Sequence, residues 1–251
     1  MRSHQLQFVF ADSPSGGGGS APTDASAGRE FLLRTANGKK VPDLSASAAD
    51  SGQLLASVAT PANLATALLN VVRNKGAPGV DGRSVKEVLG SARSLLPRLQ
   101  RALLDGTYQP GDVRRVWIPK PGGGQRGLGI PNVVDRWVQQ AVLQVLEPVF
   151  EPTFHASSHG FRPTRGAHTA IAEAKGYVSE GLGIVVDIDL SKFFDRVHHQ
   201  RLLSRLGQRI ADSRLLKLIG QMLKAKVVLP DGTRVSTDEG TPQGGPLSPL
   251  S

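Results

Sequence analysis

The 251-residue sequence contains no cysteine, no long apolar run and no phosphate-loop signature. Without cysteine the chain can form neither disulfides nor thiolate metal sites, which suits a reducing compartment. No apolar stretch approaches the roughly 18 residues of a membrane-spanning helix, and the N-terminal apolar stretch is too short for a secretory signal. Gly-Lys-Ser and Gly-Lys-Thr are both absent, which excludes the common P-loop pattern. These absences predict a soluble, intracellular protein.

Positive charge is concentrated in one part of the chain, whose net charge is +9. Residues 61–131 carry 11 basic and 4 acidic side chains, whereas residues 1–60 carry 5 of each and residues 132–251 carry 14 and 12. A concentrated basic segment is typical of a protein that binds a polyanion, most often nucleic acid. A solvated surface with surplus arginine explains the composition equally well, so composition alone leaves both interpretations open.

The first part of the chain has the composition of a disordered segment. Residues 11–28 are mostly Ser, Gly, Ala and Pro, with too few large apolar side chains to offset the entropy of an ordered backbone. We therefore predict a disordered extension over residues 1–52, in which 29–34 (REFLLR) is the candidate for a short docking turn.

Ordered structure is predicted from about residue 53. Thr60 is a good N-cap and Pro61 suits the first helical position, which together predict a helix that ends near Lys75. Glycine-rich and Pro-Asp-Gly turns predict two β-hairpins, over 113–132 and 226–240. One helix, or two with a break near Pro97, is predicted over 84–105, and further helices over 134–149, 166–180, 195–209 and 212–225. Alternating helices and hairpins indicate a domain of the α/β or α+β class.

The first hairpin carries a glycine-rich tip that superficially fits a dinucleotide-binding fingerprint. GGGQRG, residues 122–127, matches G-x-G-x-x-G, but a strand-like segment ending at Pro131 follows it where that fingerprint needs a helix. The interpretation that remains is an arm on which four cations, Arg114, Arg115, Lys120 and Arg126, can reach phosphate groups. An ordinary exposed hairpin with solubilising charges is the alternative.

Two aspartates lie on a strongly apolar stretch, IVVDIDL at 184–190. We predict that this stretch is a central, buried strand, which places Asp187 and Asp189 on the same side of it. Two carboxylates on a core strand are costly unless a cation meets them, and Mg²⁺ prefers one or two carboxylates plus water and phosphates. Aspartates at a strand end that cap the next helix are the alternative interpretation.

Five stretches, taken in order, carry a more specific signal: NKGAPGVDG (74–82), RRVWIPKPGGGQRGLGIPNVVDR (114–136), QAVLQVLEPVFEPTFHASSHGFRPTRGAHTAI (140–171), VVDIDLSKFFDRVHH (185–199) and EGTPQGGPLSPL (239–250). Together they resemble the reverse transcriptase, or maturase, encoded by bacterial group II introns. The resemblance covers most of residues 53–251 and implies a right-hand polymerase. It implies fingers over 53–180 and a partial palm over 181–251.

The resemblance also implies roles for individual residues. Asp189 corresponds to a catalytic, metal-binding aspartate and Phe194 to an aromatic gate that excludes the 2′-hydroxyl of a ribonucleotide. Arg114, Lys120 and Arg126 correspond to contacts with the triphosphate. Gln243 and Gly244 correspond to a loop that lines the nucleotide pocket, and residues 74–82 to a segment that contacts the template. Asp187 and Asp195 are expected to have supporting roles.

The implied reaction is RNA-directed DNA polymerisation in the bacterial cytoplasm, with two Mg²⁺ ions as cofactors. The implied partners are intron or template RNA, a DNA primer and deoxynucleoside triphosphates, and no membrane. The family draws further metal ligands from a Tyr-Ala-Asp-Asp turn, and these 251 residues contain no Asp-Asp pair. We therefore expect a fragment that does not polymerise alone. The alternatives are a non-catalytic RNA-binding fragment that uses the basic fingers, and a decayed gene product that does not fold stably.

Overall fold

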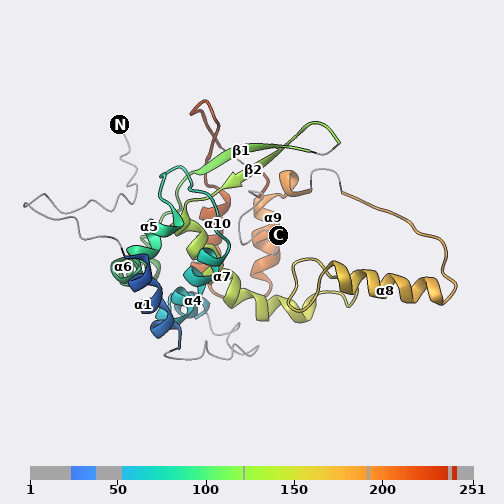
Figure 1. The fold of residues 1–251 in the computed structure, drawn as a ribbon, viewed down its shortest axis with the longest axis horizontal. Helices are drawn as coiled ribbons and strands as arrows, with labels where there is room; N and C mark the ends of the chain where they lie inside the picture. The colour runs from blue at the N-terminus through green and yellow to red at the C-terminus, as the bar shows by residue number, and fades with distance from the viewer. Residues whose placement is uncertain (1–23, 38–52, 121, 191–192, 237–238, 242–251) are drawn as a thin grey trace, which may run out of the picture.

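The computed structural model describes residues 24–37, 53–120, 122–190, 193–236 and 239–241 (Figure 1). The helices are α1 (Ala25–Asn37), α3 (Leu54–Val58), α4 (Pro61–Arg73), α5 (Val85–Gly90), α6 (Ala92–Leu104), α7 (Val133–Phe150), α8 (Ala167–Ser179), α9 (His199–Gly207) and α10 (Ser213–Leu223). Two short 3₁₀ turns cover Glu151–Thr153 and Phe193–Arg196. The strands are β1 (Val113–Pro119), β2 (Gln125–Ile130), β3 (Val227–Val228) and β4 (Arg234–Val235).

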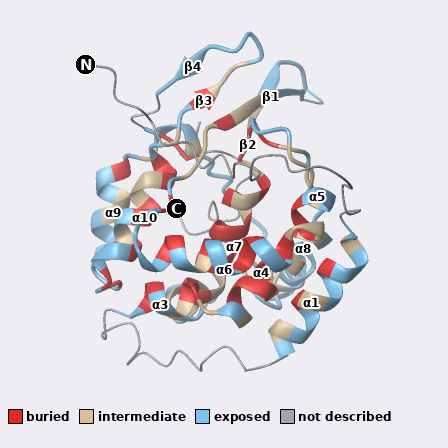
Figure 2. Cartoon of the chain, turned by 90° about the vertical axis from the view of Figure 1, so that its left-hand side faces the viewer, coloured by how far each residue is buried: buried red, intermediate tan, exposed pale blue. Residues whose placement is uncertain are grey.

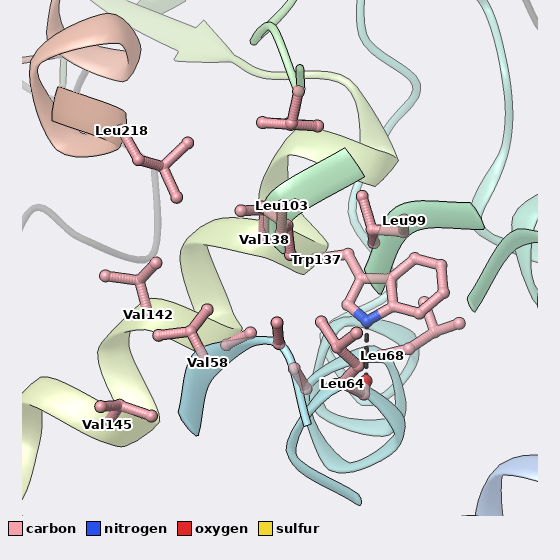
Figure 3. Close-up of a cluster of buried hydrophobic side chains, with 14 of the residues drawn as sticks. Val58, Leu64, Leu68, Leu99, Leu103, Trp137, Val138, Val142, Val145 and Leu218 are labelled. Atoms are coloured by element: carbon pink, nitrogen blue, oxygen red, sulfur yellow. Dashed lines mark hydrogen bonds between the residues drawn. The ribbon is translucent and has the colours of Figure 1, made fainter. Parts of the chain in front are cut away.

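Helices α4 and α7 form the centre of the helical core. The Thr60 hydroxyl accepts the backbone N–H of Asn63 and Pro61 opens α4, as the sequence predicted. On the inner face of α4, Leu64 and Leu68 are fully buried against α7. The indole N–H of Trp137 on α7 donates to the Leu64 carbonyl at 2.7 Å, so the largest core side chain is hydrogen-bonded as well as packed (Figure 3).

A buried amide joins three helices of this core. The side-chain amide of Asn63 donates to the carbonyls of Val58 and Ala141, each at 3.0 Å, and its own oxygen accepts from Gln144 at 2.7 Å. Because a buried polar group is costly unless it is hydrogen-bonded, these contacts fix how α3, α4 and α7 sit against one another.

The prediction of disorder over residues 1–52 is wrong for residues 25–37. These residues form α1, which packs on α4, α5 and α6 and buries Leu32 completely. A side chain at Gly28 would overlap the Leu89 carbonyl, so the helix approaches α5 more closely than another residue would allow. The prediction of disorder failed here because α1 is stabilised by this packing and not by its own composition.

The predicted break in residues 84–105 is also misplaced. It falls at Ser91, between α5 and α6, and Pro97 lies inside α6 without ending it. Helix α5 begins with a capping box in which the Ser84 hydroxyl accepts the Glu87 N–H and the Glu87 carboxylate accepts the Ser84 N–H. Both helices turn their leucines inward, toward α1 and α4, except Leu104 at the end of α6, which is exposed.

A four-stranded sheet lies at one end of the molecule, in the order β2-β1-β3-β4 (Figure 2). The two predicted hairpins are confirmed: β1 pairs with β2 in antiparallel fashion, and β3 pairs with β4 in the same way. A parallel pairing of Val113 with Val227 and Arg114 with Val228 joins the hairpins into one sheet. The base of the β1–β2 hairpin is partly buried, while its tip is exposed.

The predicted central strand at 184–190 does not form among the described residues. This segment is extended but pairs with no described strand, and its apolar side chains are exposed, from 65% for Leu190 to 91% for Ile184. A strand depends on a partner elsewhere in the chain, and apolar composition alone does not supply one.

Helices α9 and α10 add to the same core as α4 and α7, whereas α8 buries no side chain and extends away from the core (Figure 1). The Asp212 carboxylate caps α10 by accepting the N–H groups of Arg214 and Leu215, and it also accepts the Leu55 N–H of α3 at 2.9 Å. Within the described part of the chain, no helix has the length and hydropathy of a membrane span.

Candidate nucleotide and nucleic-acid interface

The tip of the β1–β2 hairpin forms an open hollow of about 610 Å³. Its lining includes the side chains of Lys120 and Arg126 and the apolar side chains of Ile118 and Leu128. Both cations are exposed, and Gly123 and Gly124 turn the chain between them with positive φ angles. The hollow thus combines an apolar floor with two exposed cations, which suits an anionic ligand that has an apolar part.

Arg114 does not share the hollow with the other two predicted triphosphate contacts. It lies on the same face of β1 as Ile118 but four positions along the strand, about 13 Å away. There it is half-buried beside the base of the sheet; burial is the main cause that lowers the pKa of Arg136, and the nearby charge of Arg114 lowers it further. The structure therefore brings Lys120 and Arg126 together and leaves Arg114 apart.

The loop at 74–82 is held against the N-terminus of α7. The side-chain oxygen of Asn132 accepts the Asp81 N–H at 3.1 Å, and Arg136 donates to the Ala77 carbonyl at 2.7 Å. Gly79 lies so close to Asn132 that a side chain there would overlap it. The sequence reading missed Asn132 and Arg136, although their position just after Pro131, at a helix start, was the available signal.

The buried carboxylate of Asp135 supports this loop through hydrogen bonds. Asp135 accepts hydrogen bonds from the Tyr108 hydroxyl, from the Gly111 N–H at 3.2 Å and from the Asn132 amide at 3.0 Å. Burial raises the pKa of Asp135 to about 6, in opposition to these three donors, and burial also raises the pKa of Tyr108. The network joins the loop, the segment before β1 and α7 into one unit.

The segment that carries Phe194 lies beside the start of the last of the five stretches, residues 239–250. The Phe194 carbonyl accepts the Thr241 N–H at 2.8 Å, and the Val197 carbonyl accepts the Gly240 N–H at 2.8 Å. Gly240 has a φ of +87°, and a side chain there would press on the backbone of Asp195. The half-buried Phe194 is thus next to this loop, while Gln243 and Gly244 lie outside the described residues.

His199 secures the same loop from the first turn of α9. It is buried, and its Nε2 is 2.7 Å from the Gly240 carbonyl, which fixes that nitrogen as the donor. The sequence reading assigned no role to His199. A histidine at the end of the 185–199 stretch was visible, but its partner 41 residues away was not.

The two aspartates of 184–190 are exposed, as the whole segment is. The physical argument for a cation at Asp187 and Asp189 rested on their burial, and exposed carboxylates are solvated by water instead. Among the described residues, no three His, Cys, Asp or Glu side chains form a group that could hold a metal ion. The residues as placed therefore do not fit a complete Mg²⁺ site, and the metal role of Asp189 stays a prediction.

Comparison with protein families decides what kind of protein this is. The family described as reverse transcriptase (RNA-dependent DNA polymerase) matches residues 118–251, just over half of the chain. The chain belongs to the reverse transcriptase family. The matched range begins in β1 and includes the hairpin tip, the Phe194 segment and the loop that His199 secures.

Relatives of this reverse transcriptase chain include group II intron proteins. It is 41% identical to Protein YkfC of Escherichia coli (strain K12) over 204 residues, which are 79% of this chain and 53% of that protein. It is 38% identical to the group II intron-encoded protein LtrA of Lactococcus lactis subsp. cremoris over 187 residues, or 72% of this chain and 30% of LtrA. The resemblance to group II intron reverse transcriptases and maturases is thus confirmed. The chain spans from about a third to about half of these relatives.

A solved structure supports the fold. The reverse transcriptase chain matches a chain of the "Partial Cas6-RT-Cas1--Cas2 complex" with a TM-score of 0.50 and 23% identity, over 78% of this chain and 32% of that one. This likeness concerns the fold alone, and it confirms the predicted mixture of helices and strands.

Proposed function

We propose that this chain forms the nucleotide-facing part of an RNA-directed DNA polymerase of the group II intron type. The polymerase joins the 3′-hydroxyl of a DNA primer to a deoxynucleoside triphosphate on an RNA template. The observation that carries this proposal is the hollow at the hairpin tip, where Lys120 and Arg126 stand over an apolar floor within the range that matches the family. Two cations there can neutralise the charge of a triphosphate as pyrophosphate leaves.

In this proposal the remaining residues have distinct parts. Phe194 excludes the ribose 2′-hydroxyl by its bulk, and Gln243 and Gly244 complete the wall of the nucleotide pocket. Arg114 stabilises nucleic acid farther along the hairpin, since it lies apart from the hollow. The loop at 74–82, held by Asn132 and Arg136, presents its backbone to the template.

Asp189 would supply one of the carboxylates for Mg²⁺, which would neutralise charge on the phosphates. Two-metal chemistry needs further carboxylates, and the 251 residues contain no Asp-Asp pair. We therefore expect no primer extension on an RNA template by the purified chain alone. Product formation that disappears in the Asp189→Ala variant would contradict this expectation, and equilibrium binding of a deoxynucleoside triphosphate tests the hollow independently.

Substitutions of Lys120 and Arg126 make the measurement of triphosphate binding specific to the hollow. Arg126→Ala and Lys120→Ala should each weaken triphosphate binding about 10-fold, because each removes a charge-assisted contact with a phosphate. Lys217→Ala, which removes an exposed cation of α10 far from the hairpin in sequence, is the control and should leave the affinity unchanged. If all three variants bound the triphosphate with equal affinity, the hollow would not be part of the nucleotide site.

A second function, RNA binding without catalysis, is favoured by the charge of residues 61–131. It predicts that affinity for RNA falls as salt rises, with a slope of log K against log salt that reflects the number of phosphate contacts. Arg114→Ala and Arg126→Ala should each reduce the slope by about 1 unit. Binding that does not depend on salt would rule out this electrostatic function.

A further inference from the structure

The β1–β2 hairpin has a second face that the proposed nucleotide site does not use. Because side chains alternate along a strand, the hollow occupies the face of Ile118, Arg126 and Leu128, and Arg115 and Trp117 lie on the other. In the ladder Trp117 is opposite Gly127, and Arg115 is opposite Gly129. The neighbouring strand thus presents no side chains beside this pair.

Trp117 and Arg115 form an ordered pair on that face. The Trp117 side chain is 48% exposed, and the guanidinium carbon of Arg115 lies 5.6 Å from the centre of its ring. Arg115 is held there by a hydrogen bond from its Nη1 to the Gly127 carbonyl at 3.2 Å. A large aromatic ring that could have been buried is instead exposed beside a positioned cation.

Gly127 makes room for this pair. A Cβ atom at position 127 would lie 2.7 Å from Nη1 of Arg115 and 2.9 Å from Cζ3 of Trp117. Both distances are shorter than van der Waals contact allows, so any side chain at 127 would displace the ring or the guanidinium. The flat surface around Trp117 therefore depends on glycine at this position.

The hairpin segment that carries the pair has only positive charges. Residues 113–130 carry four cations and no carboxylate, and within the described chain no carboxylate forms an ion pair with Arg115. A second aromatic–arginine pair, Phe154 and Arg162, differs in this respect, because Arg162 is bound to Glu151 at 2.7 Å. The hairpin pair thus retains its positive charge for an external partner.

We infer that Trp117 and Arg115 form a stacking site for a base of single-stranded RNA on the face of the hairpin opposite the nucleotide hollow. An exposed aromatic ring stacks on any base, and a guanidinium beside it contacts the base plane or the next phosphate. A single strand is specified because bases within a duplex are stacked on one another and have no free face. This inference rests on the proposed nucleic-acid function and adds a second contact to it.

The protein contains its own probe for this contact. Of its two tryptophans, Trp137 is fully buried and Trp117 is half exposed, so Trp117 accounts for most quenching of fluorescence by acrylamide. A short oligoadenylate RNA should quench Trp117 and protect it from acrylamide. A blunt RNA duplex at the same phosphate concentration should bind by charge without protecting the ring.

Variants separate stacking from charge. Trp117→Ala should weaken oligoadenylate binding by about 5- to 100-fold, whereas Trp117→Phe should retain most of the affinity. Gly127→Ala should also weaken oligoadenylate binding although Trp117 and Arg115 are both retained, because the added methyl group displaces them. Phe154→Ala is the matched control, since it removes the ring whose arginine is already neutralised, and it should leave the affinity unchanged.

Two results would overturn the inference, and they bear differently on the proposed function. If oligoadenylate binds with the expected salt dependence but Trp117→Ala binds equally well and Trp117 is not protected, the stacking site is wrong and the basic RNA-binding surface stands. If the wild-type chain binds no RNA, both fail, while triphosphate binding at the hollow remains a separate measurement. Circular dichroism of each variant establishes that it is folded before its affinity is compared.

Discussion

At the scale of single residues, Asn132 connects two parts of the candidate interface. Its side chain joins the Asp81 backbone to the Asp135 carboxylate. Asn132→Ala should release the loop at 74–82 and lower the free energy of unfolding by about 1 kcal/mol, the usual net value of such hydrogen bonds. Hydrogen exchange at residues 79–82 should accelerate in this variant. Asn74→Ala, which alters an exposed residue of the same loop, is the control, and equal acceleration in both would contradict the assignment.

Asp135 predicts an unusual pH dependence of stability. Its pKa is raised to about 6 by burial, above the ordinary value near 3.9 of an unfolded chain. The folded protein therefore holds this proton more tightly, so the contribution is present below about pH 4 and is lost as pH rises through about 6. The shift corresponds to about 3 kcal/mol.

Denaturant unfolding of wild type and Asp135→Ala tests this directly. The difference in free energy of unfolding between them should fall by about 2 kcal/mol between about pH 4 and pH 7, because only the wild type loses this proton. The Tyr108, Gly111 and Asn132 donors favour the ionised form. If these donors outweighed burial, the difference would rise with pH instead.

The residues of the candidate site differ in how far the sequence could reveal them. Lys120 and Arg126 were predictable because both flank one tight turn, and local chemistry places them together. Arg114 was grouped with them by resemblance, yet strand geometry sets it about 13 Å away. Asn132, Asp135 and His199 were missed because their partners lie far along the chain, and no local pattern encodes such a pairing.

At the scale of elements, α1 depends on close packing at a glycine. Alanine normally stabilises a helix interior by about 0.5–1 kcal/mol relative to glycine. At Gly28 the added methyl group would overlap the Leu89 carbonyl, which belongs to the backbone and cannot move aside easily. Gly28→Ala should therefore lower the melting temperature.

Gly176→Ala provides the matched comparison, because nothing lies within 4 Å of the position that its methyl group would occupy in α8. This substitution should raise helix content and stability. Thermal unfolding followed by circular dichroism measures both variants. If both substitutions stabilised the protein, α1 would not be docked on α5 as the structure shows.

The elements that could be predicted were those whose ends carry capping or turn residues. Thr60 and Pro61 defined the start of α4, and the glycines at 122–124 defined the hairpin turn. The segment 184–190 and helix α1 were misjudged in opposite directions, because each depends on what lies beside it. Apolar composition could not supply a partner strand for 184–190. The few large apolar side chains of the N-terminal region concealed α1, which is stabilised by packing on α4, α5 and α6.

At the scale of the whole molecule, the predicted fingers and palm regions share one hydrophobic core. Leu64 of α4 and Leu215 of α10 are both fully buried in it, on either side of the proposed boundary at residue 180. Leu64→Ala and Leu215→Ala should each lower the free energy of unfolding by about 2–5 kcal/mol. Because the core is shared, circular dichroism and Trp137 fluorescence should report one common midpoint.

Two outcomes would contradict a shared core. In one, Leu215→Ala would produce an early transition while the Trp137 signal stays native, so that α10 would unfold on its own. In the other, the wild-type chain would show no cooperative transition at all, which is what a gene product that does not fold stably predicts. A single sharp transition excludes both.

The parallel pairing of β1 with β3 also sets an order of events during synthesis. The β1–β2 hairpin is complete at Ile130, but its partner at Val227 is added roughly 100 residues later, after about 5–20 s of translation. In that interval the hairpin has an uncovered edge on the nascent chain, and an isolated two-stranded hairpin is marginally stable. The basic arm therefore becomes rigid only when residues 226–236 arrive, so a ribosome that stalls earlier leaves its cations on a flexible chain.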